Sequence, residues 1–405
     1  MSVLYITQNG IADHIGQSQV APYIMGLARQ GHRIHLLSAE KAGRDEVIAR
    51  YQKLFDACGI AWTRVRYHSS PKVIGPLRTQ WLMERAARRI VAAEGITAVH
   101  CRSYPAALIG RRLKRRFRIK YLYDFRDFYA DGGLTKGSLL LRPLYRRMKQ
   151  LEGPMIREAD RIVCLTRRAR DLLIDWYLAD EPAPVERFQI IPCCADFALF
   201  DPAKVEAKSL DQIRAKLGLA PGQTVLLYLG SLGPDYLLPQ MMDLFGELTK
   251  LRSDARFLFV SNNGRELVEA QCATKGIDPA RIIFTSAERS EVPAHIALAT
   301  LSVVFIRADL SKAGCSPTKL AELFAMNVPV VANCGVGDMD SIIAPERNGS
   351  ALVTEFATAS LRDAIVKVLG LREEGQIDIR RSSAEFDLPQ GVAAYAKVYR
   401  ELDNA

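Results

Sequence analysis

The sequence predicts an α/β protein made of two Rossmann-like domains that face each other across a cleft. Short β-rich runs alternate with helical patterns in both halves of the chain, which is typical of βαβ units around a parallel sheet. The chain has 405 residues, too many for one ordinary hydrophobic core. We therefore expect domains at residues 1–200 and 201–385. We expect residues 386–405 to form a helix that returns to the first domain; the alternative is that it completes the second.

The strands of the first half are short apolar runs, each followed by a loop and a helical pattern. We expect them at residues 3–7, 33–40, 98–103, 120–127, 161–166 and, before a turn and a proline, within 188–202. After the first strand we expect a loop and then a helix that starts near Ser18 and stops at Gly31. The polar stretch 203–222 separates this rhythm from the next one.

The second half restarts with an apolar run over 224–229 and a loop that contains two glycines. Similar strand-and-loop patterns follow at 255–264, 281–287, 301–307 and 328–338. In the last segment, 391–404, Val392, Tyr395, Ala396 and Tyr399 fall on one face of a helix, which predicts a buried side.

Composition limits the possible functions. No apolar run approaches the roughly 20 residues that span a bilayer, and the N-terminal run lacks the basic flank and cleavage site of a signal peptide. The eight cysteines are scattered without metal-ligand spacing, and the adjacent Cys193 and Cys194 are a poor geometry for a disulfide. We expect a reduced cytosolic protein with structural thiols, no catalytic metal and no cofactor.

Positive charge gathers in the first half, where 33 Lys and Arg face 19 Asp and Glu, against 22 and 26 in the second half. This charge leaves three interpretations open: ordinary solubility, a surface for anionic lipid or for a phosphate-bearing acceptor, and nucleic-acid binding. The membrane is favoured over nucleic acid because aromatic stacking platforms are missing between the basic residues. The densest basic stretch comprises Arg111, Arg112, Lys114, Arg115, Arg116, Arg118 and Lys120, followed by Arg142, Arg146, Arg147 and Lys149.

The segment 316–338 carries the strongest chemical signal. Ser316, a proline and Thr318 would place a capping hydroxyl at the head of a helix, where unpaired N–H groups favour an anion such as a diphosphate. Lys319 could add a cation, and Glu322, one turn later, could accept hydrogen bonds from ribose or sugar hydroxyls. The alternative is an ordinary capped amphipathic helix, but the strand and the glycine turn that follow favour a binding site.

Two glycine-bearing loops point to the same kind of ligand. In the loop 9–23, Gly10 and Gly16 would allow a close backbone approach, and Gly230 and Gly233 would do so in the loop 228–236. Neither loop has the GxGxxG pattern of a dinucleotide-dependent dehydrogenase. A tight turn is the alternative for each.

Charged residues also end the predicted strand at 120–127, where α/β proteins place reactive groups. Asp124, Arg126, Asp127 and Asp131 could form a reaction centre or a structural ion-pair network. At the end of the preceding strand, we expect His100 to be a core histidine and Arg102 to face the cleft.

Taken together, these motifs resemble the retaining family 4 glycosyltransferases of the GT-B fold, over nearly the whole chain. Five segments are similar to five family motifs and come in the same order: NGIADHIGQSQ, DFRDFYAD, IPCCADFALF, YLGSLG and SPTKLAELFAMNVPVVANCGVGD. The resemblance implies a transferase that moves a hexose, with retention and without a metal, from a nucleoside diphosphate sugar to an acceptor hydroxyl.

The resemblance also implies roles for individual residues. The donor would be bound by Gly16, Gln17, Gly230, Ser231, Gly233, Lys312, Ser316, Thr318, Lys319 and Glu322. Asp13, His14 and Arg102 would lie on the acceptor side, and Asp124, Arg126 and Asp127 would be catalytic. Three departures are Gly314 in place of a first glutamate, the missing Arg/Lys pair after YLGSLG, and Arg126 in place of histidine.

The partners expected from the resemblance are a nucleotide sugar and a polysaccharide or lipid-linked acceptor of bacterial surface type. No nucleic acid is expected. The protein would be cytoplasmic and peripheral at the cytoplasmic face of the inner membrane. A nucleotide-sugar 2-epimerase of the same fold and a catalytically inactive scaffold subunit are the alternatives.

Overall fold

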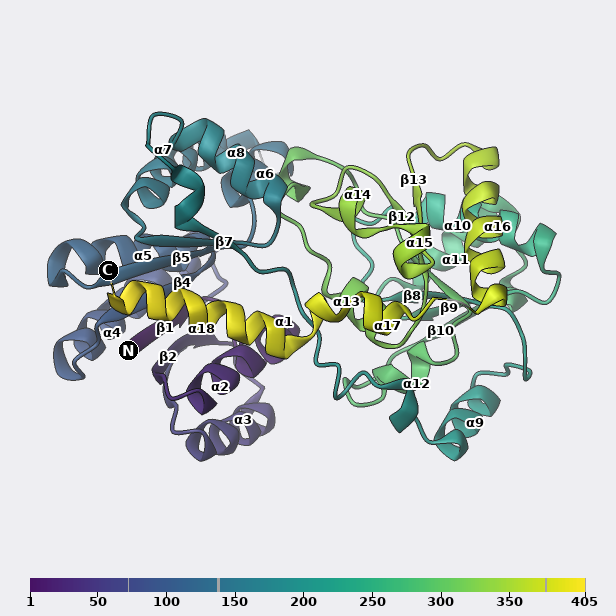
Figure 1. Cartoon of the computed structure of the whole chain (residues 1–405), viewed down its shortest axis with the longest axis horizontal. Coiled ribbons are helices and arrows are strands. Elements are labelled where there is room, and N and C mark those ends of the chain that lie inside the picture. The colour runs from purple at the N-terminus through teal and green to yellow at the C-terminus, as the bar shows by residue number, and fades with distance from the viewer. Residues whose placement is uncertain (72, 137–138, 376, 405) are drawn as a thin grey trace. The chain divides into compact units, whose positions relative to one another are not determined.

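The structure, a computed structural model, describes residues 1–71, 73–136, 139–375 and 377–404 (Figure 1). The chain divides into two compact units. Unit 1 comprises Met1–Cys193, Leu310–Cys315 and Leu388–Ala405, and unit 2 comprises Cys194–Asp309 and Ser316–Asp387. The short segment Leu310–Cys315 thus belongs with the first unit, although it lies in the second half of the sequence.

Unit 1 is built on a seven-stranded parallel sheet with the order β3-β2-β1-β4-β5-β6-β7. The order reverses between β1 and β4, which is the switch point where such sheets bind ligands. The strands are β1 Ser2–Thr7, β2 Arg33–Glu40, β3 Ala61–Arg66, β4 Ala98–Arg102, β5 Lys120–Phe125, β6 Arg161–Cys164 and β7 Phe188–Ile190.

Helices cover both faces of this sheet. The helices of unit 1 are α1 His14–Gln19, α2 Ala21–Arg29, α3 Asp45–Ala57, α4 Ile74–Ala93, α5 Ser103–Phe117, α6 Tyr129–Lys136, α7 Arg142–Glu158, α8 Arg167–Tyr177 and α18 Leu388–Asn404, with short 3₁₀ turns η1 Leu139–Leu141, η2 Pro184–Arg187 and η5 Leu310–Lys312. On one face, α4, α5, α7 and α8 share a core with alternate residues of β1, β4 and β5. On the other face, α18 packs on α2 (Figure 1).

The C-terminal helix returns to the first unit, as expected, and buries the apolar face that its sequence predicted. Val392, Tyr395, Ala396 and Tyr399 are all buried. The ring of Tyr395 contacts that of Tyr23 in α2 at a centroid distance of 5.6 Å.

The helix after the first loop differs from its prediction. It does not begin near Ser18. Instead α1 begins at His14 and breaks at Val20, and α2 follows from Ala21 with Pro22 in its first turn. The break has a local cause, since proline fits the start of a helix but not its interior.

Unit 2 is built on a six-stranded parallel sheet with the order β10-β9-β8-β11-β12-β13. Its strands are β8 Val225–Leu229, β9 Arg256–Val260, β10 Ile282–Thr285, β11 Leu301–Val304, β12 Val330–Asn333 and β13 Ala351–Val353. Its helices are α9 Ala207–Lys216, α10 Leu238–Leu251, α11 Arg265–Lys275, α12 Val292–Ile296, α13 Thr318–Ala325, α14 Met339–Ile342, α15 Pro345–Asn348, α16 Thr358–Glu374 and α17 Ile379–Ser382, with 3₁₀ turns η3 Pro202–Lys204, η4 Pro279–Arg281 and η6 Ala384–Phe386. The switch point of this sheet lies between β8 and β11.

All eight cysteines are free thiols, Cys193 and Cys194 included, and five of the eight are buried. Within the described ranges, no helix is both long enough and apolar enough to cross a membrane.

Candidate functional site

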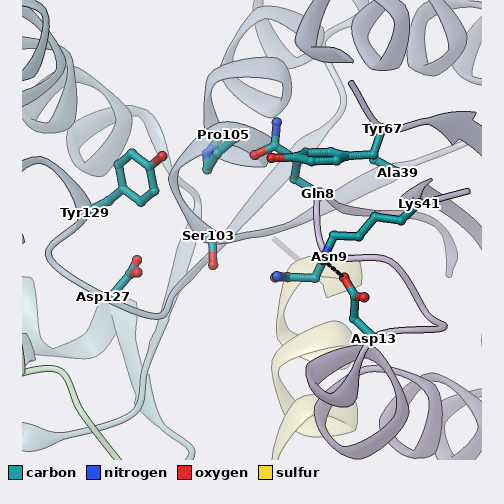
Figure 2. Close-up of a pocket in the computed structure, with 10 residues that line it drawn as sticks. All are labelled: Gln8, Asn9, Asp13, Ala39, Lys41, Tyr67, Ser103, Pro105, Asp127 and Tyr129. Atoms are coloured by element: carbon teal, nitrogen blue, oxygen red, sulfur yellow. Dashed lines mark ion pairs between the residues drawn. The ribbon is translucent and has the colours of Figure 1, made fainter. Parts of the chain in front are cut away.

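Unit 1 has a pocket of about 200 Å³ at the switch point of its sheet (Figure 2). Its lining residues follow the carboxyl ends of β1 to β5, the edge where α/β sheets bind ligands. They are Gln8, Asn9, Asp13, Ala39, Lys41, Tyr67, Ser103, Pro105, Asp127 and Tyr129. Polar side chains therefore surround a small cavity, as a sugar or another hydroxyl-bearing ligand requires.

The loop that follows β1 is held by Glu40, a residue that sequence reasoning missed. Its two carboxylate oxygens accept hydrogen bonds from the backbone N–H groups of Ile11 (2.7 Å) and Ala12 (3.2 Å). The hydroxyl of Ser38 donates to the same carboxylate at 2.6 Å. The sequence signal that could have identified Glu40 is its position as a single carboxylate at the end of the apolar strand RIHLLSAE.

The predicted acceptor-side residue Asp13 lines the pocket and forms an ion pair with Lys41 at 2.8 Å (Figure 2). Ser103, on another side of the pocket, has a φ of 69°, which is rare for a residue other than glycine. Strained backbone of this kind persists where the surrounding structure fixes it, often at ligand sites.

Three other predicted residues of the loop do not line the pocket. Gly16 is buried, and a Cβ there would lie 2.1 Å from the carbonyl oxygen of Gly10, so glycine is needed for α1 to pack on its own loop. Gln17 donates to the carbonyl of Ala12 at 3.0 Å. His14 is exposed at the start of α1. The predicted roles of these residues in binding stay predictions.

The cluster after β5 separates into two parts. Asp124 is fully buried, with Arg126 at 3.3 Å from one carboxylate oxygen and the Nε2 atom of His100 at 3.5 Å from the other. Burial alone would raise the pKa of Asp124, but Arg126 and His100 hold it well below its usual range. Asp124 and Arg126 thus form the ion-pair network that was the alternative reading of this cluster.

The same network includes the C-terminal helix. The hydroxyl of Tyr399 lies 2.8 Å from Nδ1 of His100, and the guanidinium of Arg126 donates to the hydroxyl of Tyr395 at 3.4 Å. His100 is a core histidine, as predicted, and burial lowers its pKa despite Asp124. The network therefore joins β4 and β5 to α18.

Asp127 is the member of the cluster that faces the pocket (Figure 2). Its carboxylate is solvent-accessible within a hollow of protein atoms. Desolvation in that hollow raises its pKa, while Arg102, Arg126 and Lys312 act in the opposite direction. A carboxylate with a raised pKa is suited to accept or donate a proton.

Arg102 is buried and donates to the side-chain oxygen of Asn9 at 3.2 Å, so it supports a pocket residue and does not line the pocket itself. Asp131 forms an ion pair with Lys149 at 2.7 Å. Lys312, expected to bind the donor, lies in η5 of unit 1.

The basic stretch of α5 differs from the open cationic surface that its sequence suggested. Arg111 and Arg115 both pair with Glu158, Lys114 pairs with Asp160, and Arg112 pairs with Glu84. The carboxylates come from α7, the following turn and α4, so tertiary structure neutralises charges that stand unopposed in the local sequence. The net positive charge of residues 1–200 therefore comes in part from basic residues outside this stretch.

In unit 2, the glycine loop after β8 lies beside Lys319. The Lys319 ammonium group lies 4.4 Å from the ring centroids of both Tyr228 and Tyr236. Gly230 has a φ of 108°, and a Cβ there would lie 3.2 Å from that ammonium group. A side chain at residue 230 would therefore strain the backbone and crowd the cation.

Glu322 of α13 is buried and forms an ion pair with Arg289 at 3.0 Å. Burial raises the pKa of Glu322, while Arg289 acts in the opposite direction. The guanidinium of Arg289 also lies over the ring of Phe200, at 5.3 Å. Sequence reasoning missed Arg289, since it lies in a loop after β10 with no motif.

The expected capping of α13 is wrong. The helix begins at Thr318 with Pro317 at its N-cap, and no side chain caps it. A proline at this position cannot provide a capping oxygen, and Ser316 precedes it. Ser231 is exposed in the glycine loop, and Gly233 has no atoms within 4 Å of a Cβ position.

Unit 2 also has a pocket of about 610 Å³ after β9 and β10, which sequence reasoning did not find. Asn263 shapes it by binding the backbone of Leu232 in the glycine loop, through an accepted bond of 3.1 Å and a donated bond of 2.7 Å. Its lining runs over Ser261, Asn262, Asn263, Gly264, Arg265, Glu266, Leu267, Phe284, Thr285 and Ser286. In the part of the chain that the structure describes, no three His, Cys, Asp or Glu side chains are grouped to hold a metal ion.

Comparison with known proteins gives consistent results. The model of the glycosyl transferase 4-like domain matches residues 17–193, and that of the glycosyl transferases group 1 matches residues 223–370. An alpha-monoglucosyldiacylglycerol synthase of Streptococcus pneumoniae is 22% identical over 354 residues, which cover 86% of this chain and 74% of that protein. A D-inositol 3-phosphate glycosyltransferase of Segniliparus rotundus is 26% identical over 68% of this chain and 59% of its own length.

Solved structures share the fold. Sucrose-phosphate synthase from Thermosynechococcus elongatus has a TM-score of 0.71 at 15% identity and covers 100% of this chain and 99% of its own. Anabaena HepE in complex with UDP-glucose has a TM-score of 0.68 at 15% identity, with both chains fully covered. The two family models together match more than half of the chain, and the structure has two parallel-sheet units like those of its structural neighbours. The chain therefore belongs to the family 4 glycosyltransferases and has the GT-B fold.

Proposed function

We propose that this enzyme transfers a hexose from a nucleoside diphosphate sugar to an acceptor hydroxyl, with retention of configuration and without a metal ion. The observation that carries the proposal is the charged group of unit 2. Lys319 lies beside the glycine loop, and the buried Glu322 lies with Arg289 one turn further along α13. A cation next to a carboxylate suits a ligand that has both phosphates and hydroxyls.

Each part of the donor has a candidate partner. The ammonium group of Lys319 and the first N–H groups of α13, near Ser316 and Thr318, would hold the diphosphate. The carboxylate of Glu322 would accept hydrogen bonds from ribose or sugar hydroxyls. The solved structure of HepE with UDP-glucose supports a nucleotide-sugar donor for a chain of this fold.

The chemistry follows from that placement. The bond between the anomeric carbon and the diphosphate oxygen breaks, and Lys319 together with backbone N–H groups stabilises the charge that develops on the leaving diphosphate. The acceptor hydroxyl forms its new bond on the same face of the sugar, and its proton passes to the leaving phosphate. Positive charge on the protein would replace the metal ion used by other transferases.

The acceptor would bind in the pocket of unit 1. Asp13, Ser103 and Asp127 offer polar groups to acceptor hydroxyls. The name of the pneumococcal relative, a synthase of a glucosylated diacylglycerol, supports an acceptor carried on a lipid. A lipid-linked glycan or a polysaccharide fits this pocket chemistry, and the cytoplasmic face of a membrane is the corresponding location.

The test is a transfer assay with UDP-, GDP- and ADP-sugars, a lipid-linked acceptor and excess EDTA, with the product analysed by proton NMR. The expected product keeps the anomeric configuration of the donor, and the rate is unchanged by EDTA. An inverted product would overturn retention, and a rate that EDTA abolishes and Mg²⁺ restores would overturn metal independence. A free epimerised sugar formed without acceptor would instead indicate the 2-epimerase.

A further inference from the structure

One side of α4 is exposed and apolar where an ordinary surface helix would be polar. Its buried side includes Met83, Ala87 and Ile90. On the opposite side Ile74, Leu77 and Trp81 are 65%, 59% and 57% exposed. They follow the helical spacing i, i+3, i+7, so they form one stripe. Three large apolar side chains in one exposed stripe indicate a surface that another phase or molecule covers.

The charges of α4 all favour an anionic partner. The helix contains four arginines and a single carboxylate, Glu84. Glu84 is buried and already paired with Arg88 and with Arg112 of α5. The exposed side therefore continues from its apolar stripe into Arg78, Arg85 and Arg89 without an exposed carboxylate.

A second segment repeats this pattern. In η1 and the first turn of α7, Leu139, Leu140 and Leu144 are exposed, Leu140 by 89%. Residues 139–150 contain no Asp or Glu, and Arg142, Arg146 and Arg147 are exposed among them.

The two segments belong to one layer. On the same face of the unit 1 sheet, α5 packs between α4 and α7 (Figure 1). Because a helix that follows a parallel strand starts at the carboxyl edge of the sheet, the apolar first turns of α4 lie at the edge where the pocket opens. The side-chain amide of Gln80 in α4 donates to the carbonyl of the pocket residue Pro105 at 2.8 Å.

The first turn of α7 is tied to the pocket in a similar way. Tyr145 packs so closely on α6 that a Cβ at Gly133 would lie 2.1 Å from its ring. The first residue of α6, Tyr129, lines the pocket and stacks on Tyr104 of α5 at a centroid distance of 5.8 Å. Exposed leucines and arginines therefore flank the pocket on both the α4 and the α7 sides.

We propose that this surface, the α4–α7 face, docks on an anionic lipid bilayer, so that the pocket of unit 1 receives an acceptor carried in that bilayer. The α4–α7 face comprises Ile74, Leu77, Arg78, Trp81, Arg85, Leu139, Leu140, Arg142, Leu144 and Arg146. The inference deepens the proposed function and rests on it for the identity of the pocket as the acceptor site. It places the membrane contact on these residues and not on the ion-paired stretch of α5.

The chemistry of the face matches a bilayer interface. Trp and Leu side chains enter the boundary between head groups and acyl chains, where Trp is enriched. Each arginine near an anionic surface strengthens binding by about fivefold. A nucleic acid would engage the arginines but leave the leucines and Trp81 exposed to water.

The experiment measures sedimentation of the full chain with vesicles of phosphatidylglycerol and phosphatidylcholine, and with vesicles of phosphatidylcholine alone. The test variant combines Leu77→Asp and Leu140→Asp. The control combines Val185→Asp and Val366→Asp, two apolar residues outside the α4–α7 face that are both 52% exposed. All four sites are exposed, so each variant should fold.

The wild type and the control should bind the anionic vesicles alike, and the test variant should bind at least about tenfold more weakly. Emission of Trp81 should shift to the blue on binding, and Trp81→Phe should remove that shift while retaining sedimentation. Wild-type protein that ignores anionic vesicles, or a test variant that binds like the control, would overturn the proposal. The second result would place the membrane contact elsewhere on the chain.

Nucleotide binding, measured on the same proteins, separates this inference from the proposed function. It should be equal in wild type, test variant and control, because none of the substituted residues lies on the glycine loop, on α13 or in either pocket. If none of the three proteins binds a nucleotide while their vesicle binding differs as expected, the donor assignment is refuted and the α4–α7 face stays in place.

Discussion

Glu322→Gln separates a binding role of the carboxylate from a structural one. In the ligand-free protein the carboxylate is buried, and burial raises its pKa, so its charge is not favoured by the fold alone. The amide has the same shape and can still accept from Arg289, which keeps about a third of its side chain in contact with solvent. The free energy of unfolding should therefore change by less than about 1 kcal/mol, since the remaining cation can be hydrated.

Donor binding should respond differently. A hydrogen bond from a sugar hydroxyl to a charged acceptor contributes about 1.5–3 kcal/mol, so Glu322→Gln should raise the Kd of the nucleotide sugar by roughly 10- to 150-fold. Isothermal titration calorimetry measures this change, and thermal unfolding measures stability in the same samples. The effect should also appear in the wild type as pH falls through the raised pKa of Glu322, because protonation removes the charge.

Glu247→Gln is the matched control. Glu247 is another buried glutamate of unit 2 and pairs with Lys250 on α10. It lies on neither the glycine loop nor α13. A Kd for Glu322→Gln within about twofold of that for Glu247→Gln would refute the assignment of Glu322 to the donor.

Three further predictions concern unit 1. Asp124→Asn should destabilise the fold by about 3–5 kcal/mol in thermal or denaturant unfolding, because Arg126 would keep a buried charge without its carboxylate. Since the folded-state pKa of Asp124 is depressed, the stability that its ionised carboxylate contributes is present above its ordinary pKa and is lost as pH falls towards the folded-state pKa. An Asp124→Asn variant as stable as the wild type at neutral pH would contradict this prediction. Gly16→Ala should destabilise by about 1–3 kcal/mol through its backbone clash, while Gly233→Ala, which meets no atoms, should not; equal melting temperatures for the two would exclude the clash. Asp127→Asn should lower the transfer rate at least about tenfold while Kd for the nucleotide and the melting temperature stay unchanged, and an unaltered rate would remove Asp127 from the site.

Most strands and the buried face of α18 were predictable because their signals are local and periodic. The predicted strands are short apolar runs, and the spacing of Val392, Tyr395 and Tyr399 already fixes one buried face of α18. The strands β3, whose sequence AWTRVR carries two arginines, and β13, which has three residues, were missed for want of such a run. The start of α1 was missed although Asp13, a residue type common at helix N-caps, directly precedes it. The absence of a cap on α13 could have been read from Pro317, which occupies the capping position itself.

The site was predictable only in part, because side-chain direction and tertiary pairing decide the rest. Along β5, Tyr123 and Phe125 face the shared core, so Asp124 between them must face the opposite side of the sheet. That side is covered by α18, and His100 of β4 also points to it. Asp127 comes after the strand has ended and is free of that alternation. Arg289 comes from a loop 33 residues before Glu322, and no sequence rule joins the two.

Titration of the intact chain with UDP, GDP and ADP and their sugar conjugates, followed by thermal unfolding, tests the central claim most directly. One nucleotide family should bind, and a ligand at 100 times its Kd should stabilise the protein by about 2.7 kcal/mol. At the same concentration Glu322→Gln should be stabilised by only about 0.3–1.4 kcal/mol, as its weaker binding requires. The absence of a shift with every nucleotide would contradict a donor site in unit 2 and favour a catalytically inactive scaffold.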